Sequence, residues 1–385
     1  MFSRRLIVTT LTLLGTLTNS LQAEENSPAI EAALKRAGSN RNQIQAALDG
    51  SLQAQREGMQ FLVTHMPDQD LKTLTAEFLL ENVRLAYQAR QESAWKAKIP
   101  DEIFLNNVLP YATINEKRDR WRKDFHDRFL PVIKDVQSPG MAAAKLNQNI
   151  FKLTKVKYST KRAKADQSPY ESMESGLASC TGLSVLLVDA CRSVGIPARF
   201  VGTPLWTNKS GNHSWVEIWD DGWHFTGACE ATGDSLDRGW FAGRAATAKR
   251  DELIHAIYAV SYKRTPQFFP MVWAANNRSV HAVNVTDRYT RKKEPLPKGV
   301  VIVMLRAVAK STGDRGIAAV KVTDKAGQIV FEGKTKDERF DANDHVELRL
   351  RLGEQYQIAF GKEKPSATQS FTVSKTDQLI TLPLP

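Results

Sequence analysis

One cysteine and one histidine lie in local patterns that suit nucleophilic catalysis. Cys180 follows Ser179 at the start of an apolar, helix-like run, and His213 opens a stretch that alternates like a strand. The first turn of a helix offers unpaired backbone N–H groups and the positive end of the helix dipole, which both lower the pKa of a thiol. An imidazole facing that thiol would act as its base. The pair therefore predicts a cysteine nucleophile, whose own backbone N–H would help to hold an oxyanion.

The flanking sequence predicts the elements that must position this pair. A helix is expected from Cys180 to about Val194, where Gly195-Ile196-Pro197 ends it, and a strand is expected at 198–202. The apolar stripe of that helix consists of Leu183, Leu186, Leu187 and Ala190. Alternation along the strand from His213 places Trp215 on the same face as the histidine. We expect the cysteine-bearing helix to pack on that face.

The order of these segments resembles the core of the transglutaminase-like superfamily. The resemblance covers about residues 150–265. It is carried by Gly176–Cys180, the helix after it, Gly195–Arg199, His213–Glu217 and Gly222-Trp223. The resemblance implies a papain-like α+β fold with a Cys-His-Asp triad. Within it, Cys180 would be the nucleophile and His213 the general base and later the general acid.

The sequence departs from that family at the third member of the triad. The family has an aspartate shortly after the tryptophan of the next strand, and this position holds Gly227. A two-residue turn at Asp221-Gly222 would pair His213 with Glu230, whereas a longer loop would place His213 opposite Gly227. We favour Glu230 over Thr226 as the residue that orients the imidazole.

Two other kinds of site have less support. A side-chain oxyanion donor would lie upstream of the cysteine, where Asn147 and Asn149 are candidates, although asparagines are common on helix surfaces. His224, His255 and His281 show no paired spacing of the kind that zinc ligands have. The sequence therefore predicts no metal site and no cofactor.

The first 23 residues have the pattern of a secretory signal. Arg4 and Arg5 precede the apolar run Leu6–Leu17, and cleavage is expected after Ala23. No later segment has the apolar length of a membrane-spanning helix, so we expect a soluble protein exported to the periplasm or the extracellular space. Three cysteines in an exported chain leave two arrangements open. Either Cys191 and Cys229 form a disulfide and Cys180 stays free, or all three remain thiols.

The charge balance bears on the partners. The formal net charge is +11, and loss of Arg4 and Arg5 with the signal leaves 51 basic against 42 acidic side chains. This excess favours polyanionic surroundings such as cell-wall polymers, but it is spread along the chain instead of forming one basic helix, which argues against nucleic-acid binding. The expected partner is a protein or peptide substrate, cell-wall peptide included.

Four parts follow one another along the chain in this interpretation. They are a signal peptide at 1–23, a helical region at 24–150, the transglutaminase-like core at 151–294 and an immunoglobulin-like antiparallel β-sandwich at 295–385. In the helical region, apolar spacing predicts long helices near 71–86 and 116–132. In the core, 256–262 and 280–285 would extend the sheet that carries His213.

Two functions of different classes remain open. The first is an exported cysteine enzyme that forms a thioester at Cys180, with either water or an amine as the second substrate. Hydrolysis is the default, because excluding water requires a dedicated closed site. The second is a catalytically impaired binding or scaffold protein of the cell envelope, which the missing aspartate and the sandwich favour. Retention of both Cys180 and His213 favours the enzyme.

Overall fold

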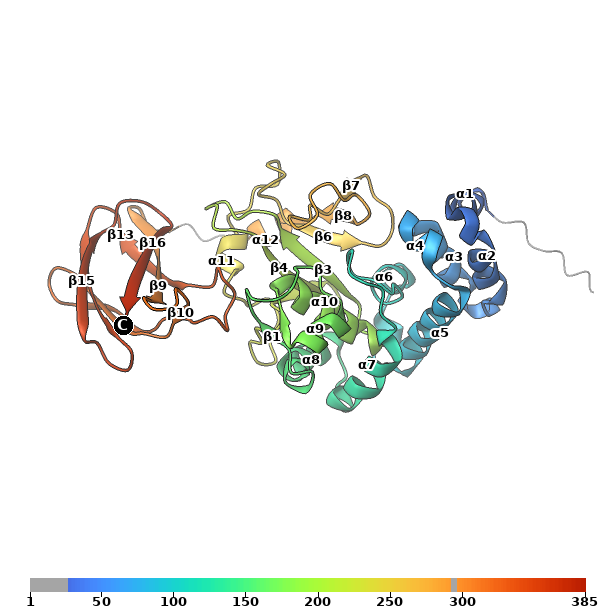
Figure 1. The fold of residues 1–385 in the computed structure, drawn as a ribbon, viewed down its shortest axis with the longest axis horizontal. Coiled ribbons are helices and arrows are strands. Elements are labelled where there is room, and N and C mark those ends of the chain that lie inside the picture. Colours follow the sequence, from blue (N-terminus) through green and yellow to red (C-terminus); the bar gives the residue numbers. More distant parts are fainter. Residues whose placement is uncertain (1–26, 292–295) are drawn as a thin grey trace, which may run out of the picture.

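The computed structural model describes residues 27–291 and 296–385, so the predicted signal peptide lies outside the described residues. A layer of helices leads into a mixed core, and a β-sandwich follows on the other side of that core (Figure 1). The predicted α+β class is confirmed. In the described part of the chain, no helix has both the length and the apolar character needed to cross a bilayer.

Eight α-helices precede the core strands in the described residues. They are α1 Pro28–Ala37, α2 Arg41–Gly50, α3 Arg56–His65, α4 Asp68–Thr73, α5 Ala76–Glu92, α6 Asp101–Asn107, α7 Trp121–Phe129 and α8 Pro139–Leu153, with short 3-10 turns at 38–40, 53–55, 96–98 and 130–133. The single helix predicted near 71–86 is wrong, because Leu74 is extended and the Thr75 side chain caps a new helix at the Phe78 N–H. The helix predicted from 116 begins only at Trp121.

The core combines helices with a six-stranded sheet. Its helices are α9 Pro169–Ser175, α10 Cys180–Ser193, α11 Ala242–Ala245 and α12 Thr286–Thr290. The sheet has the order β5-β4-β3-β6-β8-β7, formed by β3 Ala198–Thr203, β4 His213–Trp219, β5 Trp223–Thr226, β6 Tyr258–Ser261, β7 Gln267–Phe268 and β8 His281–Asn284. A separate parallel pair joins β1 Lys157–Tyr158 to β2 Leu177–Ala178. The predicted helix from Cys180 and the two extra strands of the sheet are confirmed.

The register between β4 and β5 differs from both predicted registers. Trp219 pairs with Trp223 across a three-residue loop, in which Asp221 has a φ of 55°. The ladder ends where Val216 pairs with Thr226, so β5 stops short of the level of His213. Neither Glu230 nor Gly227 therefore faces the histidine across a strand ladder.

The helix α10 packs on the face of β4 opposite to the one predicted. Val216 and Ile218 share an apolar cluster with Leu186 of the helix, and the hydroxyl groups of Thr181 and Ser214 lie 3.2 Å apart. The opposite face of β4 contributes to an aromatic cluster formed with other segments. The prediction failed because it assumed that the thiol and the imidazole must share one face in the middle of the sheet.

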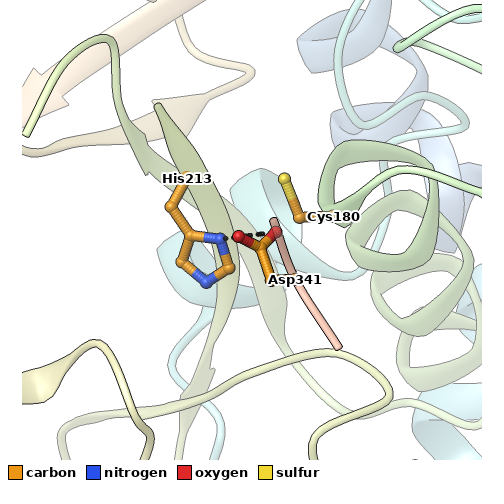
Figure 2. A group of neighbouring side chains, drawn as sticks. All are labelled: Cys180, His213 and Asp341. Carbon is orange, nitrogen blue, oxygen red and sulfur yellow. Dashed lines mark ion pairs between the residues drawn. The ribbon is translucent and has the colours of Figure 1, made fainter. Parts of the chain in front are cut away.

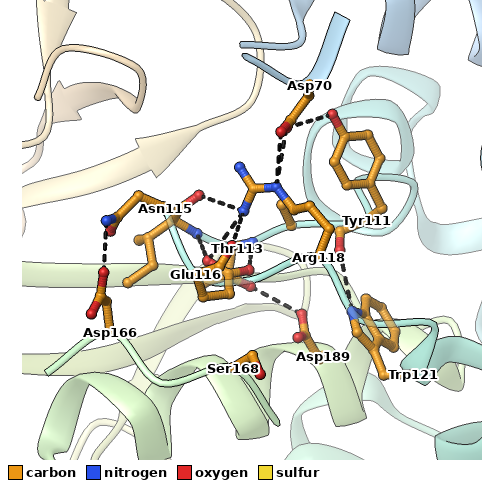
Figure 3. Close-up of polar contacts among 12 residues, drawn as sticks. Asp70, Tyr111, Thr113, Asn115, Glu116, Arg118, Trp121, Asp166, Ser168 and Asp189 are labelled. Atoms are coloured by element: carbon orange, nitrogen blue, oxygen red, sulfur yellow. Dashed lines mark hydrogen bonds and ion pairs between the residues drawn. The ribbon is translucent and has the colours of Figure 1, made fainter. Parts of the chain in front are cut away.

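Buried polar groups fix the helical layer to the core (Figure 3). Asp70 of α4 accepts hydrogen bonds from Tyr111 and from the Arg118 guanidinium, both in the connection before α7. In the same connection, the Thr113 hydroxyl donates to Asp189 of α10 over 3.0 Å. One apolar cluster continues from α1 to the sheet across residue 150. The layer therefore supports α10 from the side away from the sheet.

The C-terminal region is a sandwich of two four-stranded sheets. One contains β9 Val300–Ala309, β10 Arg315–Gly316, β13 Val346–Arg351 and β16 Gln378–Leu384; the other contains β11 Ala319–Thr323, β12 Ile329–Lys334, β14 Gln355–Gly361 and β15 Ala367–Thr372. The pairs are antiparallel except that β16 runs parallel to β9. The connection from β12 to β13 passes from one sheet to the other and leads toward the core (Figure 1).

Candidate active site

Cys180 is the first residue of α10. The Ser179 side chain caps the helix by accepting a hydrogen bond from the Gly182 N–H, and Gly176 takes a left-handed conformation with a φ of 67° just before the short strand β2. This entry leaves the thiol half-buried at the end of the helix where the dipole is positive. Local sequence thus places the Cys180 thiol at the N-terminus of α10.

His213 is the first residue of β4 and is 1% exposed. Its ring lies 4.8 Å from the ring of Trp240 and 4.9 Å from that of Phe241, measured between centroids, with Trp206 and Trp215 beyond them. Both ring nitrogens are buried without a hydrogen-bond partner in the described part of the chain. Cys180 is the first residue of α10, and His213 is the first residue of β4. Their side chains therefore meet, although α10 packs on the face of the sheet opposite to the imidazole.

The third group at this place is Asp341, from the connection between β12 and β13 of the sandwich. Its Oδ2 lies 3.4 Å from Nδ1 of His213 in a buried ion pair. The Cys180 sulfur, a ring nitrogen of His213 and a carboxylate oxygen of Asp341 all lie within 4.8 Å of one another. Figure 2 shows the carboxylate beside the imidazole on the side that faces the thiol.

Hydrogen bonds hold the Asp341 segment against the core. The N–H of Asn343 donates to the Asp341 carboxylate over 2.9 Å, and the Asn343 amide donates to the Asn212 carbonyl over 3.1 Å. Between them, the Ala342 N–H donates to the Tyr158 hydroxyl over 2.8 Å. The sandwich therefore reaches the strand that begins with His213 and the short strand before α9.

Charge within this group shifts its titration. Burial lowers the pKa of His213, but the negative Asp341 carboxylate, together with Cys180, raises it well above 6.5. Burial raises the pKa of Asp341, and the imidazolium opposes this so that the carboxyl pKa falls below its usual value. The structure thus favours a charged imidazolium–carboxylate pair beside the thiol.

Glu230 lies near this group but does not form the ion pair with His213. Burial raises the pKa of its carboxyl group to about 7, and its Oε2 has no hydrogen-bond partner in the described residues. A Cβ atom built on Gly227 would come 2.1 Å from that oxygen. The glycine at the position of the family's aspartate therefore makes room for the Glu230 carboxyl group.

The other predicted groups lie elsewhere or have other partners. The Asn147 amide donates to the Thr226 hydroxyl and to the Gly227 carbonyl and accepts from the Cys229 N–H, so it fixes the loop after β5. Asn149 donates to a carbonyl of its own helix. The suggested Cys191–Cys229 disulfide is not formed, and both residues are free thiols. Cys191 is buried in the last turn of α10, whereas Cys229 is exposed.

Sequence reasoning missed Asp341, because it lies in a predicted domain that carried no catalytic pattern. The only local signal is the polar run Asp341-Ala342-Asn343-Asp344 between two strands. Such runs are ordinary turn sequences, since aspartate and asparagine bond to nearby backbone. Only the docking of the sandwich gives the residue its position next to His213.

Comparisons with known proteins show which proteins this chain resembles. Residues 130–228 match the model of the transglutaminase-like superfamily. Similar solved structures include a candidate cysteine protease from Cytophaga hutchinsonii, with 15% identity, a TM-score of 0.28 and coverage of 49% of this chain and 58% of that one. They also include red sea bream transglutaminase, with 10% identity, a TM-score of 0.31 and coverage of 73% and 66%. A search of curated proteins found no match.

Proposed function

We propose that the protein is a cysteine acyl-transfer enzyme, from the premise that residues 130–228 match the model of the transglutaminase-like superfamily. The Cys180 thiolate attacks the carbonyl carbon of an amide, while His213 carries the thiol proton and donates it to the leaving amine. The product of this half-reaction is a thioester and a free amine. Water, deprotonated by His213, then releases the acid and restores the thiol. The observation that carries the proposal is the convergence of Cys180, His213 and Asp341 within 4.8 Å.

We propose that two carboxyl groups share the role of the family's single aspartate. Asp341 supplies the charge, since its pKa is low and it pairs with the imidazole. Glu230 fills the space that Gly227 leaves, and its pKa of about 7 makes it partly neutral at neutral pH. An acid that holds the imidazolium is worth several powers of ten in rate in related triads. We expect Asp341→Asn to lower the rate about 100-fold or more, and Glu230→Gln to lower it about tenfold.

The substrate and the setting belong to the same proposal. Hydrolysis of a peptide or amide makes the fewest structural demands on the site, because transfer to an amine would also require the site to exclude water. A signal at residues 1–23 would bring the protein to the periplasm or the cell exterior, where peptides of the cell wall are available substrates. The positive net charge suits such a polyanionic surface.

Thiol alkylation tests the nucleophile. Iodoacetamide near pH 7 should label Cys180 first, since an imidazolium keeps its thiolate in place. The other two cysteines serve as internal controls. Partial desolvation, together with the nearby Glu230 carboxylate, raises the pKa of Cys229 to about 11, and full burial raises that of Cys191 further still. His213→Ala should slow labelling of Cys180 about tenfold or more. If Cys180 reacts no faster than an ordinary exposed thiol, the enzyme is excluded and the binding or scaffold function stands.

A further inference from the structure

The Cys180 thiol, the His213 imidazole and the Asp341 carboxylate point toward one shared place (Figure 2). They come from three segments far apart in the sequence: the first turn of α10, the first residue of β4 and a connection of the sandwich. The imidazole and the carboxylate are almost fully buried, and the thiol is half-buried. We infer that these three side chains form a binding site for a zinc-type divalent transition metal.

The spacing between the His213 and Asp341 atoms fits two ligands of one metal ion better than it fits a hydrogen bond. The Cys180 sulfur lies within 4.8 Å of both and would move closer on binding, since sulfur and nitrogen ligands of one zinc ion are about 3.6 Å apart. The 3.4 Å between His213 Nδ1 and Asp341 Oδ2 exceeds the roughly 2.7–2.9 Å of a charge-assisted hydrogen bond. Two zinc bonds of about 2.0–2.1 Å at a tetrahedral angle separate their ligand atoms by about 3.3–3.4 Å. Neither ring nitrogen has a hydrogen-bond partner in the described part of the chain. A bound cation would replace a proton of the buried imidazolium and give that ring nitrogen a partner.

The donor set determines the class of metal. Thiolate sulfur and imidazole nitrogen select zinc and its neighbours in the first transition row, while Ca²⁺ and Mg²⁺ prefer oxygen alone. Three protein ligands leave a fourth tetrahedral position, which water or the Glu230 carboxyl group would take. Glu230 qualifies because its Oε2 is buried and has no hydrogen-bond partner in the described residues.

Metal binding would switch the site off, and this part of the inference rests on the proposed function. The thiol loses its proton to solvent as the metal–sulfur bond forms, and the metal takes the imidazole lone pair that would otherwise accept a proton. No oxidant or reductant is needed. The metal would also link the sandwich to the core, because Asp341 belongs to the sandwich and the other two ligands belong to the core. Binding should therefore stabilise the docked arrangement.

The test titrates the metal-free, full-length chain with Zn²⁺ in competition with a chromophoric chelator. We expect the wild type to bind one equivalent of Zn²⁺. The affinity for Zn²⁺ should fall about tenfold or more in Asp341→Asn and about 100-fold in Cys180→Ser. Glu363→Gln, which alters an exposed carboxyl group of the same sandwich, should bind as the wild type does. Co²⁺ should give a sulfur-to-metal charge-transfer band that Cys180→Ser abolishes. Circular dichroism checks that each variant is folded.

Equal Zn²⁺ affinity in the wild type and Asp341→Asn, or a cobalt spectrum that survives Cys180→Ser, would overturn the inference. Zn²⁺ should also protect Cys180 from iodoacetamide, and Asp341→Asn should remove that protection at the same metal concentration. The two proposals fail separately. Slow alkylation of the metal-free protein contradicts the enzyme, whereas absence of zinc binding contradicts the metal site and leaves the enzyme untouched.

Discussion

The charge of the His213 imidazole depends on carboxyl groups, because the rest of its surroundings is aromatic. Trp240 and Phe241 exclude water from the ring without offering it a hydrogen bond in the described residues. Asp341 opposes the effect of that burial, and Glu230 lies close enough for its own pKa to respond to His213. A change at either acid should therefore be visible in the titration of the site.

Asp341→Asn should lower the pKa of His213. The variant keeps the shape of the side chain and removes the negative charge of Asp341, so that only Cys180 still opposes the lowering of the imidazole pKa by burial. We expect the titration midpoint of the ring to fall. NMR of the His213 ring protons measures it, with His224 as an internal reference, since its imidazole is partly exposed and pairs with Asp237 away from Asp341. An unchanged His213 midpoint would contradict the pairing.

The wild type should lose stability as pH rises, and the Glu230→Gln variant should not show the part of this loss that comes from Glu230. Burial raises the pKa of this carboxyl group from 4.5 to about 7, so between these values the unfolded chain has released a proton that the folded chain keeps. The free energy of unfolding therefore falls as pH rises through this window, by roughly 1–3 kcal/mol for a partly exposed side chain.

Urea unfolding at pH 5, 6, 7 and 8 measures the effect of Glu230. The free energy of unfolding of Glu230→Gln, relative to that of the wild type, should increase steadily up to about pH 7 and then stay constant. The difference between the two proteins isolates Glu230 from His213, Asp341 and Asp344, which titrate in both. Parallel curves at all four pH values would show that the carboxyl group is not buried in solution.

At the scale of elements, α10 is fixed from both sides. Its apolar face packs on β4, and buried polar groups of α7 and of the connection before it hold its far end. The helix and its neighbouring strands were predictable, because an apolar stripe, a glycine–proline stop and strict alternation are local signals. The register of β5 was not predictable, since it depends on the three-residue loop at Asp220–Gly222. The face of β4 on which α10 packs was not predictable either, since it depends on contacts between segments distant in the sequence.

Arg122→Met should destabilise the protein by about 3 kcal/mol. The buried guanidinium donates to the Asn82 amide oxygen and to the carbonyl oxygen of Arg192 near the end of α10, and it also satisfies the carbonyls of residues 108–110. Methionine fills the space but leaves these acceptors unpaired. Arg128→Met on the same helix is the control, because that exposed side chain pairs only with Asp124 in the described residues, and it should cost below about 0.5 kcal/mol. Equal losses in chemical denaturation would contradict this role.

At the scale of the whole molecule, the candidate site is shared between two regions. Arg244 of α11 donates to Glu347 of the sandwich over 3.1 Å, and Asn343 reaches the carbonyl just before β4. Sequence reasoning predicted both regions and the linker between them. It could not predict that the sandwich contributes to the site, because the contact joins residues more than a hundred positions apart through surface complementarity and no local motif.

Tyr158→Phe should loosen this docking and impair the site without touching the thiol, the imidazole or the carboxylates. The Tyr158 hydroxyl accepts the Ala342 N–H next to Asp341, and phenylalanine would leave that N–H unpaired at the interface. We expect about 1 kcal/mol less stability and about tenfold slower alkylation of Cys180. Tyr170→Phe is the matched control, because in the described residues its hydroxyl makes only long contacts, of 3.4 Å, to Arg120 and Asp124. If both variants alkylate at the same rate, Asp341 is held in place by other contacts, and the sandwich does not depend on Tyr158 to complete the site.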